Sequence, residues 1–202
     1  MCKISFKIFN VALCFGLISA IFLSLAVFDA RCEDLRKNVL RLHIIANSDN
    51  ADDQNLKLEI RDEILSQSTD LFDTATDIAS AKIIAEQRLS EFKEIAEQVI
   101  SDNGFDYTVS VKLDKSFFET RVYDDFTLPA GIYDSLLITI GEGKGKNWWC
   151  VIFPEICVSA ASKGDLTDTV SNESAAVAKS QKKYKAEFKI VEVYQKIKKL
   201  IK

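Results

Sequence analysis

Hydrophobic residues form one long uninterrupted run near the start of the chain. Ile8 to Phe28 is a stretch of 21 residues without a charge, and Lys3 and Lys7 precede it. A run of this length can cross a bilayer as a helix, and basic residues before it stay on the cytosolic side. We therefore expect residues 1–30 to be a signal peptide or a membrane anchor, and the rest of the chain to be exported across the cytoplasmic membrane.

The sequence does not decide whether this apolar run is cleaved as a signal peptide or retained as a membrane anchor. It is longer than the apolar region of most signal peptides, which favours an uncleaved anchor through residues 8–28. Ser24, Leu25 and Ala26 nevertheless place small residues at the spacing that a signal peptidase requires. Lipoprotein processing is excluded, because Arg31 directly precedes Cys32 where a small residue is needed.

Beyond this segment, the apolar positions alternate or recur with helical spacing. Residues 39–46, "VLRLHIIA", predict a strand, and Asn50 and Asp53 then predict the capped start of a helix. A second helix is expected over residues 77–100 from its apolar stripe. Three further strands are expected at 107–113, 132–140 and 147–153, the last two joined by "GEGKGK" as a hairpin loop.

This order predicts an α+β fold for a domain at residues 31–158. Helices that are separate from a run of strands favour a two-layer sandwich. We expect a largely antiparallel sheet of about four strands with two helices, preceded by the N-terminal hydrophobic helix and followed by a basic C-terminal one.

The C-terminal region differs in composition. Residues 159–181 are rich in small and polar residues and predict a flexible linker. Residues 182–202 predict an amphipathic helix with one apolar face, which could bind an anionic membrane or an acidic partner, or simply keep its lysines in water. The residues singled out for this role are Lys182, Lys183, Lys185, Phe188, Lys196, Lys198 and Lys199.

Charge is distributed unevenly along the chain. Residues 179–202 carry a net charge of +7, and residues 8–178 carry −13. An acidic body repels phosphate backbones, so we expect no nucleic-acid binding by the domain. The C-terminal segment thus has a strong net positive charge while the body of the chain is acidic.

No motif for a cofactor or a metal is complete. The "GEGKGK" stretch lacks the glycine spacing and the Ser or Thr of a phosphate loop, and a strand follows where a dinucleotide fingerprint needs a helix. Asp49, Asp52 and Asp53 lack the other ligands of a calcium loop. One histidine and scattered cysteines do not make a zinc site. We expect no cofactor and no catalytic residues.

Three cysteines follow the N-terminal segment: Cys32 lies just past it, and Cys150 and Cys157 lie further along the exported domain. Cys150 and Cys157 could form a disulfide in an oxidising compartment or remain buried thiols. The enzymatic alternative is an exported thiol hydrolase in which Cys150 is the nucleophile and His43 its base. Burial in an apolar strand argues against a reactive thiol, and His43 is expected to be a satisfied strand residue.

Two stretches are candidates for a partner interface. Trp148 and Trp149 must point to opposite faces of their strand, so one of them meets solvent, a covering segment or a partner. The junction Asn47, Ser48 and Asp49 is more polar than helix capping requires, and it serves either turn geometry or contact.

Two long segments resemble the stage II sporulation protein R family. They are "RLHIIANSDNADDQNLKLEIRDEIL" and "LPAGIYDSLLITIGEGKGKNWWCVIFPEIC", which stand in order over about residues 39–157. The lysine-rich C-terminus lies outside the shared core.

The resemblance implies a developmental signal of endospore-forming bacteria. Such proteins are made in the forespore and exported into the space between two membranes. There they activate a membrane-embedded aspartyl protease of the mother cell, which processes the precursor of a mother-cell sigma factor. A signal of this kind acts by being recognised and is not an enzyme. No contact residue can be carried over from the family.

Overall fold

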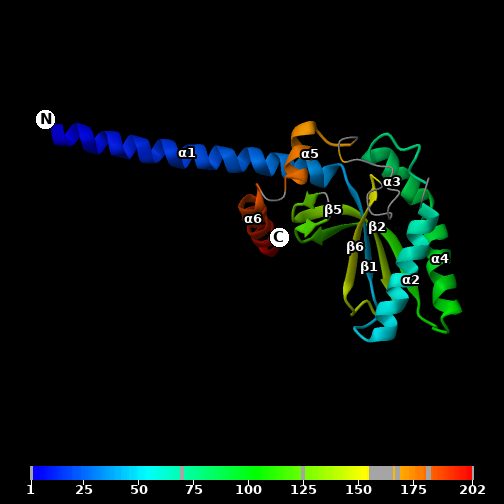
Figure 1. Ribbon diagram of the computed structural model, residues 1–202. Helices are drawn as coiled ribbons and strands as arrows, with labels where there is room; N and C mark the ends of the chain where they lie inside the picture. Colours follow the sequence, from blue (N-terminus) through cyan, green and yellow to red (C-terminus); the bar gives the residue numbers. More distant parts are fainter. Residues whose placement is uncertain are drawn as a thin grey trace.

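A computed structural model describes residues 2–68, 71–123, 126–154, 166, 169–180 and 183–201 of the chain. Its elements in chain order are α1 (Cys2–Lys37), β1 (Leu40–Ile45), α2 (Ala51–Ser68), α3 (Ile78–Gln87), α4 (Leu89–Asp102), β2 (Val109–Phe118), β3 (Arg121–Val122), β4 (Thr127–Leu128), β5 (Gly131–Ile140), β6 (Asn147–Phe153), α5 (Asn172–Lys179) and α6 (Lys185–Ile201). The expected α+β class is confirmed. Figure 1 shows the domain at one end of α1, which projects away from it.

The main sheet has four strands in the order β2-β5-β1-β6. β1 pairs with β5 in parallel and with β6 antiparallel, and β2 pairs with β5 antiparallel, so the sheet is mostly antiparallel. The prediction of a hairpin between β5 and β6 is wrong, because β1 lies between them. The "GEGKGK" loop therefore crosses the end of β1 instead of turning back on a neighbouring strand.

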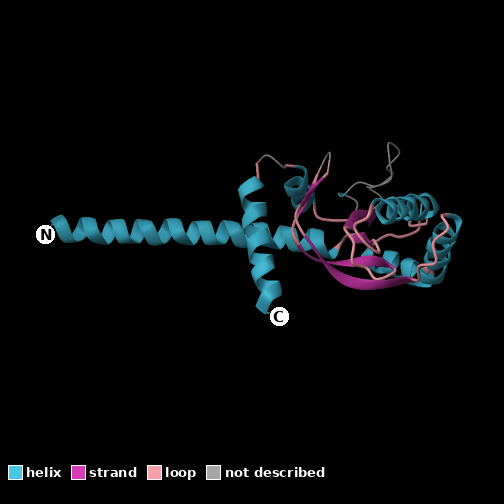
Figure 2. Ribbon diagram, turned by 90° about the horizontal axis from the view of Figure 1, so that it is seen from below, coloured by secondary structure: helices cyan, strands magenta, loops and turns pink. Residues whose placement is uncertain are grey.

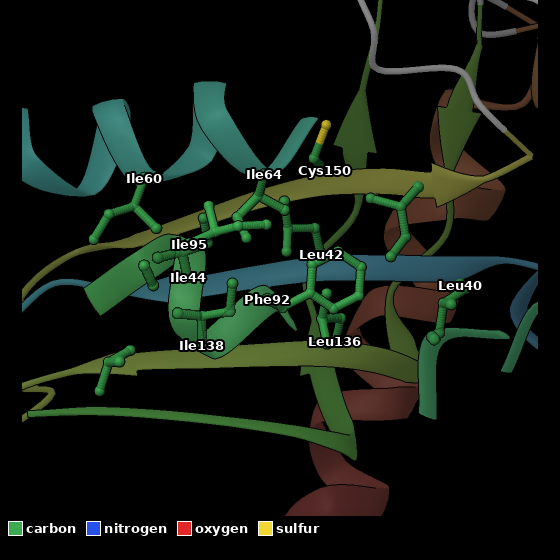
Figure 3. Packing of buried hydrophobic residues seen from close by; sticks show 14 of the residues in the cluster. Leu40, Leu42, Ile44, Ile60, Ile64, Phe92, Ile95, Leu136, Ile138 and Cys150 are labelled. Carbon is green, nitrogen blue, oxygen red and sulfur yellow. The ribbon is translucent and has the colours of Figure 1, made fainter. Parts of the chain in front are cut away.

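One face of the sheet packs against α2, α3 and α4. Leu42 and Ile44 of β1 meet Ile60 of α2 and Phe92 of α4 in this core, and all four are at most 2% exposed. Figure 3 shows these side chains between the strands and the two helices. The expected single helix over 77–100 is two helices, because the backbone N–H of Arg88 turns back to the carbonyls of Ala85 and Glu86.

The opposite face is covered in part. Leu35 near the end of α1, Leu128 of β4, Val151 of β6 and Ala178 of α5 form a second core there. Residues 172–179 therefore do not belong to a flexible linker. Ser171 caps α5 by accepting a hydrogen bond from the backbone of Ser174 (3.3 Å), and the helix buries its small apolar residues against α1.

The N-terminal helix is continuous from the apolar run into the domain. Its large apolar side chains from Phe6 to Val27 are exposed except for half-buried Leu25, whereas Phe28, Cys32 and Leu35 are buried. By length and composition α1 can cross a membrane. A third cluster of buried side chains lies at the domain end of α1. It joins Phe28 and Cys32 to Val177 of α5 and to Phe188 and Val191 of α6.

Candidate functional site

The polar junction after β1 is joined to the loop between β5 and β6. Asn47 accepts a hydrogen bond from the backbone of Glu142 (3.0 Å) and donates one to Asp53 (2.9 Å). Asp49 accepts from the backbone of Lys146 (2.7 Å), and the carbonyl of Asn47 accepts from Lys144 (3.0 Å). The two stretches, about 95 residues apart in sequence, form one unit at the end of the sheet.

Glycines in the loop permit this approach. Gly141 and Gly143 have positive φ angles of 53° and 61°, which glycine adopts without a steric penalty. A Cβ atom at Gly145 would lie 2.2 Å from the carbonyl oxygen of Ser48, so the backbones of loop and junction are in contact. Side chains of Asn47 and Asp49 are thus occupied in holding the loop.

Asp53 is the buried centre of the junction, at 1% exposure. Asn50 caps α2, because its side-chain oxygen accepts a hydrogen bond from the backbone N–H of Asp53 (2.7 Å), as predicted. Burial opposes the charged form of Asp53, but hydrogen bonds, that from Asn47 among them, hold its pKa below the ordinary value. The carboxylate stays ionised and fixes the turn.

The two tryptophans lie on opposite faces of β6, as expected, and both are half-buried. Trp148 packs against the helix-side core, with the Arg61 guanidinium 4.3 Å from its ring centroid. Trp149 packs on the other face, with Arg121 at 4.4 Å. Neither indole N–H has a hydrogen-bond partner among the described residues. Each arginine therefore covers an aromatic ring that would otherwise face solvent.

His43 lies beside Trp149 on that second face. Its Nε2 is 2.9 Å from Asn147 Oδ1 and its Nδ1 is 3.3 Å from Ser116 Oγ, so both ring nitrogens have partners. Burial is the largest effect on its pKa and lowers it. His43 is a neutral, satisfied strand residue at pH 7, as the sequence predicted.

The alternative hypothesis of a catalytic Cys150–His43 dyad is wrong. Cys150 faces α2 with the core that includes Leu42, and Figure 3 shows it on the same side of the sheet as Ile64. His43, one position along β1 from Leu42, contacts Phe118 and Trp149 on the opposite face. Cys150 is also disulfide-bonded. Cys157 lies outside the described residues, so the pairing of these two cysteines stays a prediction.

Arg41 is a buried charge that sequence reasoning missed. Its side chain is 0% exposed and lies 4.0 Å from the ring centroid of Phe118 and 4.9 Å from that of Tyr133. It donates a hydrogen bond to the hydroxyl of Tyr123 (2.8 Å). Burial lowers the pKa of its guanidinium. A charged residue inside the apolar run "VLRLHIIA" was the available signal.

A hollow of about 640 Å³ opens between the second face of the sheet and α6. His43, Asn147 and Trp149 line it on one side, and Lys196, Lys199 and Leu200 of α6 line it on the other. The hollow brings the tryptophan candidate and the C-terminal lysines together. The Asn47–Asp49 junction does not line it. Lys182 lies outside the described residues.

The C-terminal helix has two apolar faces instead of the single one expected. Phe188 and Val191 are buried against the domain, while Ile190, Val193, Tyr194 and Ile197 are about half exposed. The sequence signal was present in the recurrence of apolar residues at 190, 193, 197 and 201.

The fold and these surfaces define an α+β domain carried on a hydrophobic N-terminal helix. A family model described as Stage II sporulation protein R matches residues 36–163. Stage II sporulation protein R of Bacillus subtilis (strain 168) is 37% identical over 143 residues, which cover 71% of this chain and 64% of that protein. No solved structure matches the chain. The chain belongs to the Stage II sporulation protein R family.

Proposed function

We propose that this protein is an exported developmental signal that activates a membrane-embedded aspartyl protease of the mother cell. The protease then processes the precursor of a mother-cell sigma factor. Family membership carries the proposal, because the match at residues 36–163 covers the folded domain. The apolar helix α1 supports it by supplying a means of export from the forespore.

The proposed mechanism is differential binding. A ligand activates its receptor only if it binds the active state more tightly than the idle one. The exported domain would order the part of the protease outside the membrane, or its dimer. A rigid domain suits this role, because little conformational entropy is then lost on binding.

The proposed contact surface is the face that carries Trp149. The polar groups of Asn47 and Asp49 already hold the loop between β5 and β6, so the junction is left out of the proposed surface. Asn147 is exposed beside Trp149 and bounds the same hollow. A half-buried aromatic ring beside polar groups is typical of an interface anchor.

Co-expression in a non-sporulating host tests the activity. The full chain, the protease and the sigma-factor precursor are produced together, and precursor cleavage is followed by immunoblot. Cleavage is expected with the full chain and not with a chain that lacks residues 2–26 and stays in the cytosol. Absence of cleavage while the full chain is demonstrably exported would contradict the proposal.

The contact surface has a separate test with a matched control. Asn147→Arg places a bulky charge beside Trp149, whereas Asn103→Arg places one at the exposed end of α4. We expect the first variant to abolish precursor cleavage and the second to retain it, at equal levels of folded protein. Equal activity of both variants would remove this surface from the proposal and leave the activation itself standing.

A further inference from the structure

The exposed face of α6 is the largest concentration of exposed apolar side chains outside α1. Among the described residues after Val27, nine large hydrophobic side chains are exposed, and six of them belong to α6. They are Ile190 (50%), Val193 (50%), Tyr194 (51%), Ile197 (50%), Leu200 (85%) and Ile201 (81%). A soluble monomer rarely leaves such a row in water, so this face is an interaction surface.

The position of α6 identifies what covers it. Phe28, the last residue of the apolar run, is in contact with Tyr184 and Phe188, at ring-centroid distances of 5.5 and 5.2 Å. Figure 2 shows α6 lying across α1 between the projecting part of α1 and the sheet. The 21 uncharged residues that end at this crossing span about 32 Å as a helix, close to the hydrocarbon thickness of a bilayer. A membrane that surrounds them ends at the level of α6.

The charges beside the exposed face agree with a lipid surface. Lys185, Lys189 and Lys198 are exposed on α6, and Lys189 and Lys196 are 3.0 Å from Glu192. Lysines near an anionic bilayer contribute about 1 kcal/mol each, and tyrosine is enriched at the interface. Tyr194 lies within the apolar face.

We propose that α6 is an interfacial helix that lies on the outer surface of the membrane crossed by α1. Its exposed row enters the boundary between headgroups and acyl chains, and its lysines meet anionic lipid. One helix across the bilayer and one along it hold the domain in a single orientation. The hollow between α6 and Trp149 then opens directly at the membrane surface.

Depth measurement in nanodiscs tests this placement with the full chain. Ile197→Trp adds a fluorophore to the exposed face, and Ile83→Trp is the matched control, since Ile83 is 59% exposed on α3. The nanodiscs contain phosphatidylcholine and phosphatidylglycerol, with or without bromine atoms on the acyl chains. The tryptophan emission of the wild type is subtracted from that of each variant, and the remaining emission is compared between the brominated and unbrominated nanodiscs. Roughly half or more of the emission added at 197 should be quenched, because interfacial helices bury their apolar face about 5–10 Å deep. The emission added at 83 should not be quenched.

Other results overturn the proposal in distinct ways. Red-shifted, unquenched emission at 197 would mean that the face remains in water. Blue-shifted emission without quenching would mean that protein covers it, such as a second copy of the chain. Lys185→Glu with Lys198→Glu should reduce quenching in the anionic nanodiscs and leave it unchanged in pure phosphatidylcholine. An equal effect in both lipids would contradict the role assigned to charge.

Discussion

Arg41 shows how one residue type can be required inside a core. Its planar guanidinium lies over two aromatic rings, and its Nε and Nη1 atoms have no hydrogen-bond partner among the described residues. Stacking therefore stabilises the charge more than hydrogen bonding does. Lysine cannot replace this contact, because an ammonium is more strongly hydrated and has no planar face.

For Arg41, we expect Arg41→Lys to lower the free energy of unfolding by about 2 kcal/mol, the scale of a desolvated cation–π contact. Arg41→Met should lower it less, because it removes a buried charge at nearly constant volume. Urea unfolding of the full chain in detergent micelles, followed by tryptophan fluorescence, measures both. A larger loss for the methionine variant would contradict this reading of the site.

The lowered pKa of His43 predicts that the stability of the protein depends on pH. Burial holds its pKa in the folded protein below the ordinary 6.5, so the unfolded chain binds the proton first as pH falls. Stability should therefore decrease as pH drops through about 6.5, and the decrease should end below the folded pKa. Asp53 and Glu192, whose pKa values are also lowered, lose their contribution only at lower pH, below about 4.

Thermal unfolding between pH 7 and 5 checks this effect. His43 is the only histidine in the chain, so His43→Gln should flatten the profile in that window. A profile that is equally steep in the variant would show that other groups titrate there.

At the scale of elements, the junction after β1 and the loop after β5 depend on each other. Asn47→Ala removes the bonds to Glu142 and to buried Asp53, and we expect it to cost about 1–3 kcal/mol of stability. Asn103→Ala is the control, because Asn103 is exposed and its hydrogen bonds, to the carbonyl of Val99 (3.0 Å) and to exposed Glu59 (2.6 Å), lie at the surface. It should cost about 0.5 kcal/mol or less. The same urea titration compares them, and equal losses would argue against the coupling.

The elements themselves were largely predictable, and the site was predictable in part. The strand at 147–153, the cap at Asn50 and the opposite orientations of Trp148 and Trp149 follow from local periodicity. The hydrogen bonds between Asn47 and Glu142 do not, since they join positions far apart in sequence. The break at Arg88 was missed because the apolar stripe continues on both sides of it.

At the scale of the whole molecule, the first part of α1 projects from the domain and its last part is buried within the domain. The buried residues of α1 begin at Phe28, the last residue of the apolar run. A chain of residues 27–202 should therefore keep the unfolding free energy of the full chain. Residues 38–202 should fail to fold, because Phe28, Cys32 and Leu35 each contribute about 1.5–3 kcal/mol of burial to a total of about 5–15. Near-UV circular dichroism and urea unfolding measure this. A stable 38–202 chain would place the domain boundary after α1.

The sequence alone determined the membrane-length helix, the α+β class, the basic helix and the family. Each of these depends on neighbouring residues or on a short pattern, and local chemistry is sufficient to specify it. Only the tertiary structure decided that β1 lies between β5 and β6. It also decided that His43 and Cys150 lie on opposite faces of the sheet, and that one apolar face of α6 is buried while the other is exposed. Those outcomes depend on which strands pair and on which segments cover each face. The free energy of such contacts involves residues far apart in the chain, so no single stretch of sequence is sufficient to predict it.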